Sequence, residues 1–413
     1  MNLKIGYFVP EFPMFTHVFF WREIQVLQNS NVDLEYFSTS TPKTGHQGGH
    51  DWIKELQSKV TYLLPLSFEF DLVREAFSTP LRRWAAAIML ILTAKDVSFK
   101  ERLGLFPALI LGLKLKRKLR QTQVQHIHSH FCFRGADIVL FSSILSGIPF
   151  SISYHGPFWG VGNQRHKWAN AAFGICITKH GEDIVTKEVG KENLPPHMFV
   201  APMGVDSDTF TRESTYKPFN GSGPLHIFSA GRICSHKGHG KMVEAVEKLV
   251  SEGYDIQLRI AGSDLSGQEY NKKLGELIAA RNLTSHVHLL GPISNKKIKE
   301  ELEETHIFAL ASFEEPFGVV YAEAMSMEIP TIGTNAGGVP ELIQDGVNGF
   351  MVEPRDVDSL VRCIRNIARN PDLAVKVGIN GRKRVVENFS SRRSPEALLK
   401  GIELSGSSRQ PSS

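Results

Sequence analysis

The 413-residue sequence has few cysteines, no long apolar run and no low-complexity segment. Its four cysteines, Cys132, Cys176, Cys234 and Cys363, form no Cys-x-x-Cys pair, so a disulfide scaffold or zinc site is disfavoured and a reducing compartment is favoured. The longest apolar run, Trp84–Leu92, is far short of the ~20 residues that span a bilayer. The opening MNLKIGYFVPEF lacks the basic region, apolar core and cleavage site of a secretory leader.

Positive charge is concentrated in one part of the first half. Residues 72–120 contain 11 Lys or Arg against three acidic residues. Two basic stretches, Leu81–Trp84 and Lys114–Arg120, lie beside bulky apolar residues. Such a pattern suits a helix on an anionic membrane, and we favour this over nucleic-acid binding. A solvated helix face over an ordinary buried stripe remains the alternative.

Short apolar runs alternate with helical patterns along the whole chain. This rhythm predicts an α/β protein with parallel sheets covered on both faces. The expected strands are Lys4–Val9, Leu34–Ser38, Val60–Leu64, His126–Ser129, Phe150–Tyr154, Gly174–Ile177, Phe199–Ala201, Leu225–Ala230, Gln257–Ala261, Val287–Leu290, Ile307–Ala311, Thr331–Gly333 and Gly349–Val352. The helices include Lys241–Glu252, Tyr270–Arg281, Asn295–Glu304 and Tyr321–Met327.

The rhythm pauses at 206–224, which is polar and rich in turn residues, so we expect a linker there. It separates two Rossmann-like domains, 1–205 and 225–388, with a cleft between them. A C-terminal helix over 389–404 is expected to return to the N-terminal domain, and 405–413 to form a disordered tail. In such sheets ligands bind at the carboxyl ends of the strands.

The strongest motif lies after the strand IFALAS. Glu315 and Glu323 stand eight residues apart, and Pro316, Phe317 and Gly318 open the next helix. A helix N-terminus presents free N–H groups to a phosphate or another anion. The carboxylate of Glu323 can accept two hydrogen bonds from a diol such as a ribose.

Two further motifs follow strand ends. Arg232 and Lys237 stand five residues apart after LHIFSA, and two cations there predict a diphosphate clamp, although such residues are more often surface solubilisers. The paired glycines of 335–341 allow backbone to approach a ligand closely, or form a plain turn.

Together, the Arg-x4-Lys pair, the Glu-x7-Glu pair and the Gly-Gly-x-Pro-Glu run resemble the retaining GT-B glycosyltransferases of family 4. The resemblance spans nearly the whole chain and is most specific from Leu225 to Val352. It implies the GT-B fold, with two Rossmann-like domains whose parallel sheets face each other across a cleft. It also implies transfer of a sugar from a nucleotide-diphosphate donor.

The resemblance assigns roles to individual residues. Arg232 and Lys237 would hold the diphosphate, Glu323 the ribose and Glu315 hydroxyls of the donor sugar. His155, which follows strand FSISY, would lie near that sugar. The remaining donor contacts would come from Gly231, the amides of Phe317, Gly318 and Val319, and the base-binding residues Gly291, Pro292 and Ile293.

The implied chemistry retains the anomeric configuration, and we identify no covalent nucleophile. We expect a same-face displacement in which the leaving phosphate accepts the proton of the acceptor. No Asp-x-Asp occurs in the chain, and the Arg/Lys clamp makes a metal unnecessary, so we expect no metal and no cofactor besides the co-substrate. UDP-sugars are favoured over GDP-sugars.

The opening loop resembles bacterial exopolysaccharide glycosyltransferases of the colanic-acid type, through Phe12-Pro13, Phe19 and Glu23-Ile24. His17 stands where that subgroup has a glutamate. Candidate acceptor or loop contacts are Phe12, Pro13, Thr16 and His17. The run 126–131, with three alternating histidines, also resembles the subgroup; adjacent strand positions seldom close a tetrahedral metal site.

These observations predict a cytoplasmic hexosyltransferase, peripheral on the inner face of the plasma membrane. Its acceptor would be a polyprenyl-linked oligosaccharide of cell-surface polysaccharide synthesis, with 72–120 docking on the membrane. The alternatives are a nucleotide-sugar epimerase on the same architecture, a donor-binding protein without catalysis, and a glycosyltransferase with a soluble sugar acceptor.

Overall fold

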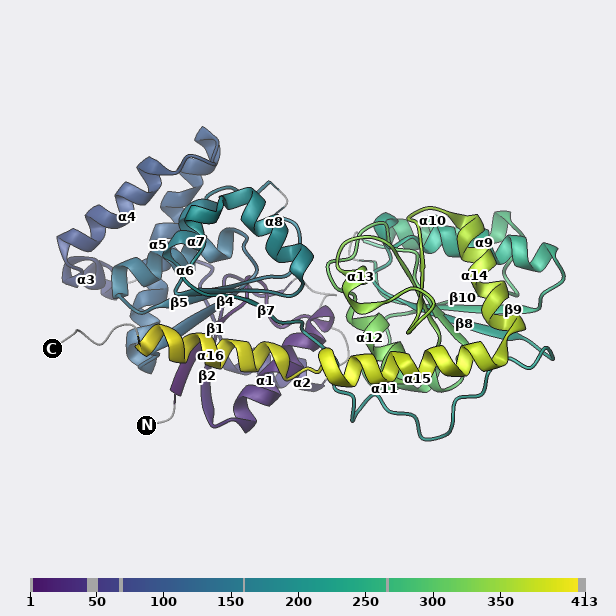
Figure 1. Cartoon of the computed structure of the whole chain (residues 1–413). Helices are drawn as coiled ribbons and strands as arrows, with labels where there is room; N and C mark the ends of the chain where they lie inside the picture. The colour runs from purple at the N-terminus through teal and green to yellow at the C-terminus, as the bar shows by residue number, and fades with distance from the viewer. Residues whose placement is uncertain (1–2, 43–50, 67–69, 159, 265–266, 408–413) are drawn as a thin grey trace. The chain divides into compact units, whose positions relative to one another are not determined.

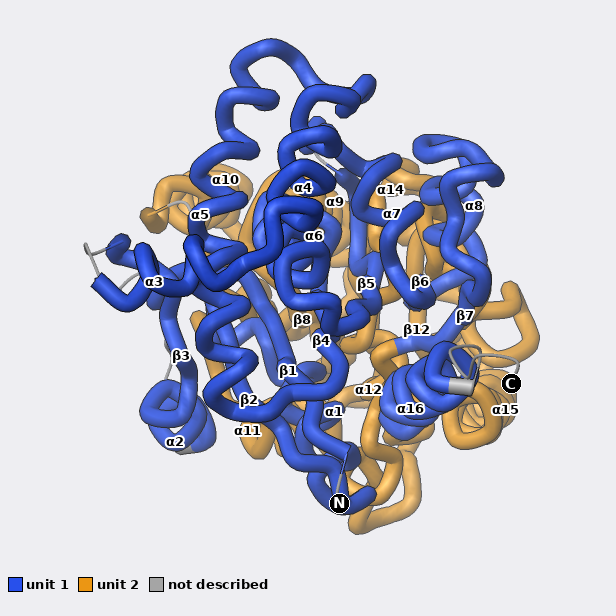
Figure 2. The backbone as a smooth tube through the Cα atoms, turned by 90° about the vertical axis from the view of Figure 1, so that its left-hand side faces the viewer, with its two compact units in different colours: residues 1–202, 391–413 blue, residues 203–390 orange. Residues whose placement is uncertain are grey.

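The computed structural model describes residues 3–42, 51–66, 70–158, 160–264 and 267–407. The chain divides into two compact units, which Figure 2 colours separately. The first unit comprises residues 1–202 and 391–413, and the second comprises residues 203–390.

The first unit is built on a seven-stranded sheet in the order β3-β2-β1-β4-β5-β6-β7, and every pairing in it is parallel. Helices lie on both faces of the sheet (Figure 1). The strands are β1 Leu3–Phe8, β2 Val32–Ser38, β3 Val60–Tyr62, β4 His126–His130, β5 Phe150–Tyr154, β6 Phe173–Cys176 and β7 Met198–Val200. The helices are α1 Val18–Asn29, α2 Asp51–Lys59, α3 Phe70–Ser78, α4 Leu81–Thr93, α5 Phe99–Thr122, α6 Arg134–Ser146, α7 Gln164–Asn170, α8 Lys179–Val189 and α16 Arg393–Ser407.

The second unit contains a six-stranded parallel sheet in the order β10-β9-β8-β11-β12-β13. Its strands are β8 Leu225–Ala230, β9 Ile256–Ala261, β10 Val287–Gly291, β11 Ile307–Ala309, β12 Thr331–Thr334 and β13 Phe350–Val352. Its helices are α9 His239–Ser251, α10 Glu269–Ala280, α11 Asn295–Glu303, α12 Val319–Ser326, α13 Val339–Leu342, α14 Val357–Arg369 and α15 Pro371–Asn388.

The strand predictions are confirmed, because each predicted strand is present with boundaries within two residues. Central strands of a parallel sheet are buried on both faces and therefore read as short continuous apolar runs. Strand β11 shows this plainly, since all three of its residues are apolar and buried. The α/β class with two parallel sheets follows directly from this pattern.

Two segments that lie between or after the two predicted Rossmann-like domains belong to the units. The segment 206–224 lies within the second unit, where the buried Tyr216 donates a hydrogen bond to the carbonyl of His306 at 2.7 Å. Helix α16 packs beside α1 in the first unit (Figure 2). It continues through the first residues of the predicted tail, to Ser407, while 408–413 lie outside the described residues.

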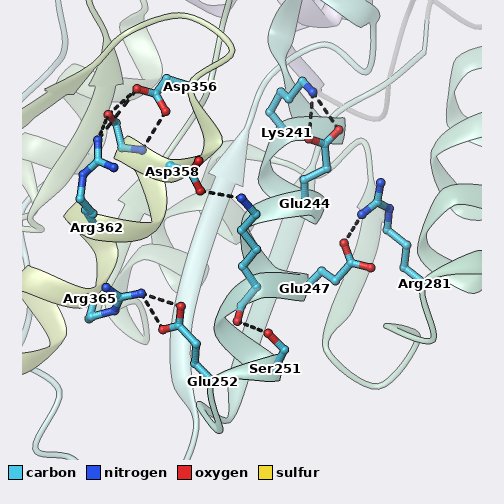
Figure 3. A network of polar contacts seen from close by, with 12 residues as sticks. Lys241, Glu244, Glu247, Ser251, Glu252, Arg281, Asp356, Asp358, Arg362 and Arg365 are labelled. Carbon is cyan, nitrogen blue, oxygen red and sulfur yellow. Dashed lines mark hydrogen bonds and ion pairs between the residues drawn. The ribbon is translucent and has the colours of Figure 1, made fainter.

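Exposed ion pairs tie α9 to its neighbours on the outside of the second unit (Figure 3). Lys248 of α9 pairs with Asp358 of α14 at 2.5 Å, and Arg365 of α14 pairs with Glu252 at 2.6 Å. Arg281, which follows α10, pairs with Glu247. Helix α9 is therefore anchored along its length, beginning directly after the loop that carries Lys237.

Candidate functional site

The two strongest sequence motifs follow neighbouring strands, and the structure brings them into contact. Strands β8 and β11 pair in parallel, so the loops that follow them leave the same edge of the sheet. The ammonium of Lys237 forms an ion pair with Glu315, 78 positions further along the chain. Because Lys237 is 9% and Glu315 6% exposed, the pair is largely shielded from water.

Backbone and side-chain contacts hold the carboxylate of Glu315 in place. Ser312 donates a hydrogen bond to it at 3.3 Å, and the amide of Gly338 donates to the Glu315 carbonyl at 2.8 Å. Gly337 has φ = +61°, and a Cβ there would lie 2.2 Å from the same carbonyl. The close approach expected of the glycine pair is therefore made to the backbone of Glu315.

Helix α12 begins directly after this loop. Gly318 precedes it with φ = +83°, and a Cβ at Gly318 would meet the ring of Tyr321 at 2.3 Å. Burial raises the pKa of Tyr321 well above its ordinary value, and its neutral hydroxyl donates to the Leu310 carbonyl at 2.9 Å. The first N–H groups of α12, from Val319 on, thus open beside Glu315 and suit an anion. Phe317 precedes the helix and is buried.

Glu323 lies in the second turn of α12 and is also buried. Both members of the Glu-x7-Glu pair are thus placed by the same loop and helix, one ahead of the N-terminus and one inside it.

Arg232 supplies an exposed cation next to the buried pair. Among the residues that the structure describes, no carboxylate pairs with its guanidinium. Its backbone is fixed, because His239 lies with Nε2 at 3.2 Å from the Arg232 carbonyl. Burial lowers the pKa of His239 to about 4, so the ring is neutral at pH 7 and can donate this hydrogen bond. The backbone of the preceding Gly231 packs closely against Gly262, because a Cβ at Gly262 would lie 1.8 Å from the Gly231 carbonyl.

The residues expected around the base lie on the same edge of the sheet. Gly291 ends β10, which is separated from β8 by β9 alone, and Ile293 follows it. The Gly291 carbonyl accepts a hydrogen bond from the amide of Gly262 at 2.9 Å. Both Gly291 and Ile293 are partly exposed, in contrast to the Lys237–Glu315 pair.

In the first unit, His155 follows β5 and lies against a histidine of β4. Its Nε2 is 3.0 Å from Nδ1 of His130, and burial lowers the pKa of both rings well below the ordinary value. His128 on the same strand contacts the hydroxyls of Ser151 and Ser153 at 2.7 and 2.9 Å. Within the described ranges, no group of three or more His, Cys, Asp or Glu residues is arranged to hold a metal ion.

The candidate loop residues of the first unit are mostly buried. Phe12, Pro13 and His17 are buried, and only Thr16 of the four is partly exposed. His17 lies among aromatic rings, including Phe20 at 5.1 Å, and burial lowers its pKa to about 3. Of these four candidates, only Thr16 therefore has a side chain that is accessible to a ligand.

Part of the basic segment 72–120 faces inward, which corrects the expectation that Lys114 and Lys116 face a membrane. Lys114 donates to the Leu63 carbonyl at 2.9 Å, and Lys116 pairs with the buried Glu75 at 2.7 Å. Arg120 reaches the same carboxylate at 2.7 Å. Neighbouring helix α3 carries Glu75, so these charges tie α3 to α5.

Sequence reasoning missed several residues that support these groups. Ser312 orients Glu315, and Ser394 of α16 donates to Glu23 of α1. Glu23 drew notice only through the Glu-Ile match, and nothing in the sequence links it to Ser394, 371 positions away. Such pairings depend on the tertiary fold alone.

Comparison with known proteins identifies related chains. Residues 212–384 match the family described as glycosyl transferases group 1. The alpha-maltose-1-phosphate synthase of Mycolicibacterium smegmatis is 30% identical over 307 residues, 66% of this chain and 77% of that protein. The capsular polysaccharide biosynthesis glycosyltransferase CapM of Staphylococcus aureus is 28% identical over 221 residues, 51% of this chain and 55% of that protein.

Among solved structures, HepE of Anabaena in complex with UDP-glucose is similar, with a TM-score of 0.72 at 16% identity. The match covers 97% of this chain and 100% of that one. At this identity the likeness concerns the fold, and it confirms the predicted two-sheet GT-B architecture.

Proposed function

The chain belongs to the group 1 glycosyl transferases, and from this premise we propose that it transfers a hexose from a nucleotide-diphosphate sugar to a lipid-linked oligosaccharide, with retention of configuration. The observation that carries the proposal is the buried Lys237–Glu315 pair, which lies between an exposed arginine and a helix N-terminus. This combination gathers positive potential at the carboxyl edge of a parallel sheet, where such folds bind nucleotides.

The diphosphate of the donor is the group that this potential suits. When the bond between the anomeric carbon and the phosphate oxygen breaks, negative charge grows on the departing diphosphate. Arg232 can bind the diphosphate through its planar guanidinium, and Lys237 can bind it through an ammonium already oriented by Glu315. The amides of Gly318 and Val319 can donate hydrogen bonds to it. A single contact of this kind contributes about 3 kcal/mol, or about a hundredfold in rate.

The donor is a UDP-sugar in this proposal. The crystallised Anabaena HepE holds UDP-glucose on the same fold, which supports the uridine series. Glu323 accepts hydrogen bonds from the ribose hydroxyls, and Gly291 and Ile293 contact the base at the end of β10. Glu315 and His155 hydrogen-bond hydroxyls of the donor sugar.

The reaction is a same-face displacement. The acceptor oxygen forms a bond to the anomeric carbon while the carbon–oxygen bond to the phosphate breaks. The proton of the acceptor hydroxyl passes to an oxygen of the leaving diphosphate, so no protein side chain becomes covalently attached. The scheme contains no metal, because Arg232 and Lys237 supply the positive charge.

A lipid-linked acceptor requires contact with a membrane, and the helices α4 and α5 support such contact. Apolar side chains stand exposed on α4 at Leu81, Ile88, Met89 and Leu92, and on α5 at Phe99, Leu103, Phe106 and Ile110. Each set recurs at helical spacing, so each helix carries one exposed apolar stripe. Arg82, Lys95 and Lys100 are exposed beside these stripes. No helix in the described ranges is long and apolar enough to cross a bilayer.

An apolar stripe flanked by cations is typical of a helix that lies in the membrane interface. We therefore assign membrane docking to α4 and the first half of α5 rather than to the inward-facing Lys114 and Lys116. A role in cell-surface polysaccharide synthesis is supported by CapM, whose name places it in capsular polysaccharide biosynthesis.

Vesicle sedimentation tests the docking surface. Leu92→Glu combined with Phe99→Glu should lower binding to phosphatidylglycerol vesicles at least tenfold, because both changes put charge on the stripes. Ile379→Glu is the matched control, since Ile379 is 53% exposed on α15 against 58% for Leu92. Equal binding by all three proteins would contradict docking through α4 and α5 and favour a soluble acceptor.

Calorimetry with UDP, GDP, ADP and their sugar conjugates tests the donor. We expect binding of the uridine series, unchanged by EDTA, followed by transfer of labelled sugar to a polyprenyl-diphosphate oligosaccharide. Absence of binding to every nucleotide would contradict the proposal. Conversion of the donor to its epimer without any acceptor would favour the epimerase alternative.

A further inference from the structure

A chain of buried polar contacts leads from two helices to His155 in the first unit. It begins at Glu23 of α1, which is 1% exposed. Its carboxylate accepts a hydrogen bond from the hydroxyl of Tyr7 at 2.5 Å and another from the hydroxyl of Ser394 at 2.5 Å. Donors from β1 and α16 thus fix the orientation of an acid that lies in the core.

His130 of β4 continues the chain. Its Nε2 approaches Glu23 at 3.1 Å, though without the alignment of a full hydrogen bond, and its Nδ1 lies 3.0 Å from Nε2 of His155. A carboxylate offers only lone pairs, so the hydrogen of neutral His130 is favoured on Nε2, facing Glu23. The opposite tautomer would set a nitrogen lone pair against the carboxylate.

This choice determines the tautomer of His155. With its hydrogen on Nε2, His130 presents a lone pair at Nδ1, and His155 must donate from its own Nε2. The Nδ1 atom of His155 then carries a lone pair. Within the described residues this atom has no hydrogen-bond partner, and the side chain is partly exposed.

Aromatic rings hold the two imidazoles and keep water from the chain. Phe20 lies 4.4 Å from the His130 ring and 5.3 Å from the His155 ring, and Phe131 lies 5.0 Å from His155. The contact between the histidines is therefore shielded, and an electrostatic preference at one end is transmitted with little screening.

We propose that Glu23 and His130 are positioning residues that hold His155 as the Nε2–H tautomer, so that its Nδ1 accepts a hydrogen bond from a hydroxyl of the donor sugar. The second part of this inference rests on the proposed function. Ser394 supports the same arrangement from α16, since it supplies one of the donors that orient Glu23.

Nitrogen-15 NMR of histidine-labelled protein without donor tests the tautomer directly, with the His155 signals assigned by their loss in His155→Gln. We expect Nδ1 of His155 to have the shift of an unprotonated nitrogen and Nε2 that of a protonated one. The reverse would overturn the proposal without any variant having to fold. This result does not depend on whether the protein binds a nucleotide, so failure of the proposed function stays distinguishable.

Glu23→Gln then tests the source of the preference. Its amide can present either a donor or an acceptor to His130, so we expect the His155 signals to shift toward a mixture of tautomers. We also expect kcat to fall at least tenfold, with KM for the donor within about twofold. Glu23→Asp, which keeps the charge, should restore part of both.

Glu35→Gln is the control, because Glu35 pairs with Lys4 outside this chain of contacts. It should leave the NMR signals and kcat unchanged. A Glu23→Gln protein that folds but keeps both the wild-type tautomer and the wild-type kcat would overturn the positioning role.

Discussion

Two groups of basic side chains, one in each unit, show opposite ways of using positive charge. In the first unit, Lys116 is buried against Glu75 and Lys114 against a backbone carbonyl, so both cations are matched inside the protein. In the second unit, Lys237 is matched by Glu315, but Arg232 is exposed and no described carboxylate pairs with it. The density of basic residues in the sequence therefore does not tell which cations are left exposed to meet a ligand; the partners that the fold supplies decide this.

Glu75→Ala removes the carboxylate that pairs with the buried Lys116, and it should cause the largest free-energy change of these variants. It leaves Lys116 buried without its partner, for which we expect a loss of about 3–5 kcal/mol in the unfolding free energy of the first unit. All five tryptophans lie in residues 1–202, so tryptophan fluorescence in urea reports this unit alone.

The double variant Glu75→Leu with Lys116→Met is the matched control. It removes both buried charges and should recover most of the lost stability, because apolar replacement of a buried pair is often neutral. A Glu75→Ala protein as stable as the wild type would show that the pair does not hold α3 to α5.

Arg232→Ala removes the unmatched cation. Turnover should fall about a hundredfold, equivalent to about 2.7 kcal/mol, because a positioned donor to the growing phosphate charge is lost. Stability should not change, since the side chain is exposed. Steady-state transfer assays check the first expectation and thermal unfolding the second.

Lys241→Ala provides the comparison for that experiment, because Lys241 lies nearby in sequence but pairs with Glu244 at 2.8 Å. It should leave turnover within about twofold. Equal losses in the two variants would mean that bulk positive charge, rather than the unmatched guanidinium, supports the reaction.

His17 extends the comparison to a buried group that is kept neutral instead of paired. Burial gives His17 a pKa of about 3, against the ordinary 6.5. Between these two pH values the unfolded chain binds more protons than the folded chain, so the stability that is present above pH 6.5 is lost as the pH falls. His17→Phe should reduce the loss between pH 7 and pH 5 by about 2 kcal/mol. Urea unfolding at both pH values checks this; identical losses in both proteins would contradict it.

Lys248→Ala breaks a matched pair at the surface and should have the smallest effect. Because Lys248 and Asp358 are both exposed, we expect less than about 1 kcal/mol. Hydrogen exchange of α9 amides measures the change locally. A larger loss would indicate that the network of Figure 3 acts as a unit rather than as separate pairs.

The sheets were predictable from the sequence because each buried strand has its own local signal. The run Ile307–Ala311, for example, is apolar and short, so it can be recognised without knowledge of its neighbours, and its first three residues form β11. The proximity of Lys237 and Glu315 was also predictable, since both residues follow parallel strands whose carboxyl ends lie at the same edge of the sheet. Their direct ion pair was not expected, because each had been assigned to a ligand.

The orientation of the basic helix α5 could not be predicted in this way. Lys114 and Lys116 read as solvent-facing because lysine is seldom buried without a partner, and the partner of Lys116, Glu75, comes from a separate helix. The support of Glu23 by Ser394 is equally non-local. Side-chain pairing between distant segments needs the tertiary fold, whereas strand formation needs only the nearby sequence.

The position of α16 has a consequence for how the protein is made. Ser394 is translated only after the whole of the second unit, yet the carboxylate that it orients belongs to the first. A ribosome therefore releases the strands of the first sheet long before the chain can supply the last hydrogen bond to Glu23. In the nascent first unit, Glu23 therefore lacks the hydrogen bond from Ser394 until the whole second unit has been synthesised.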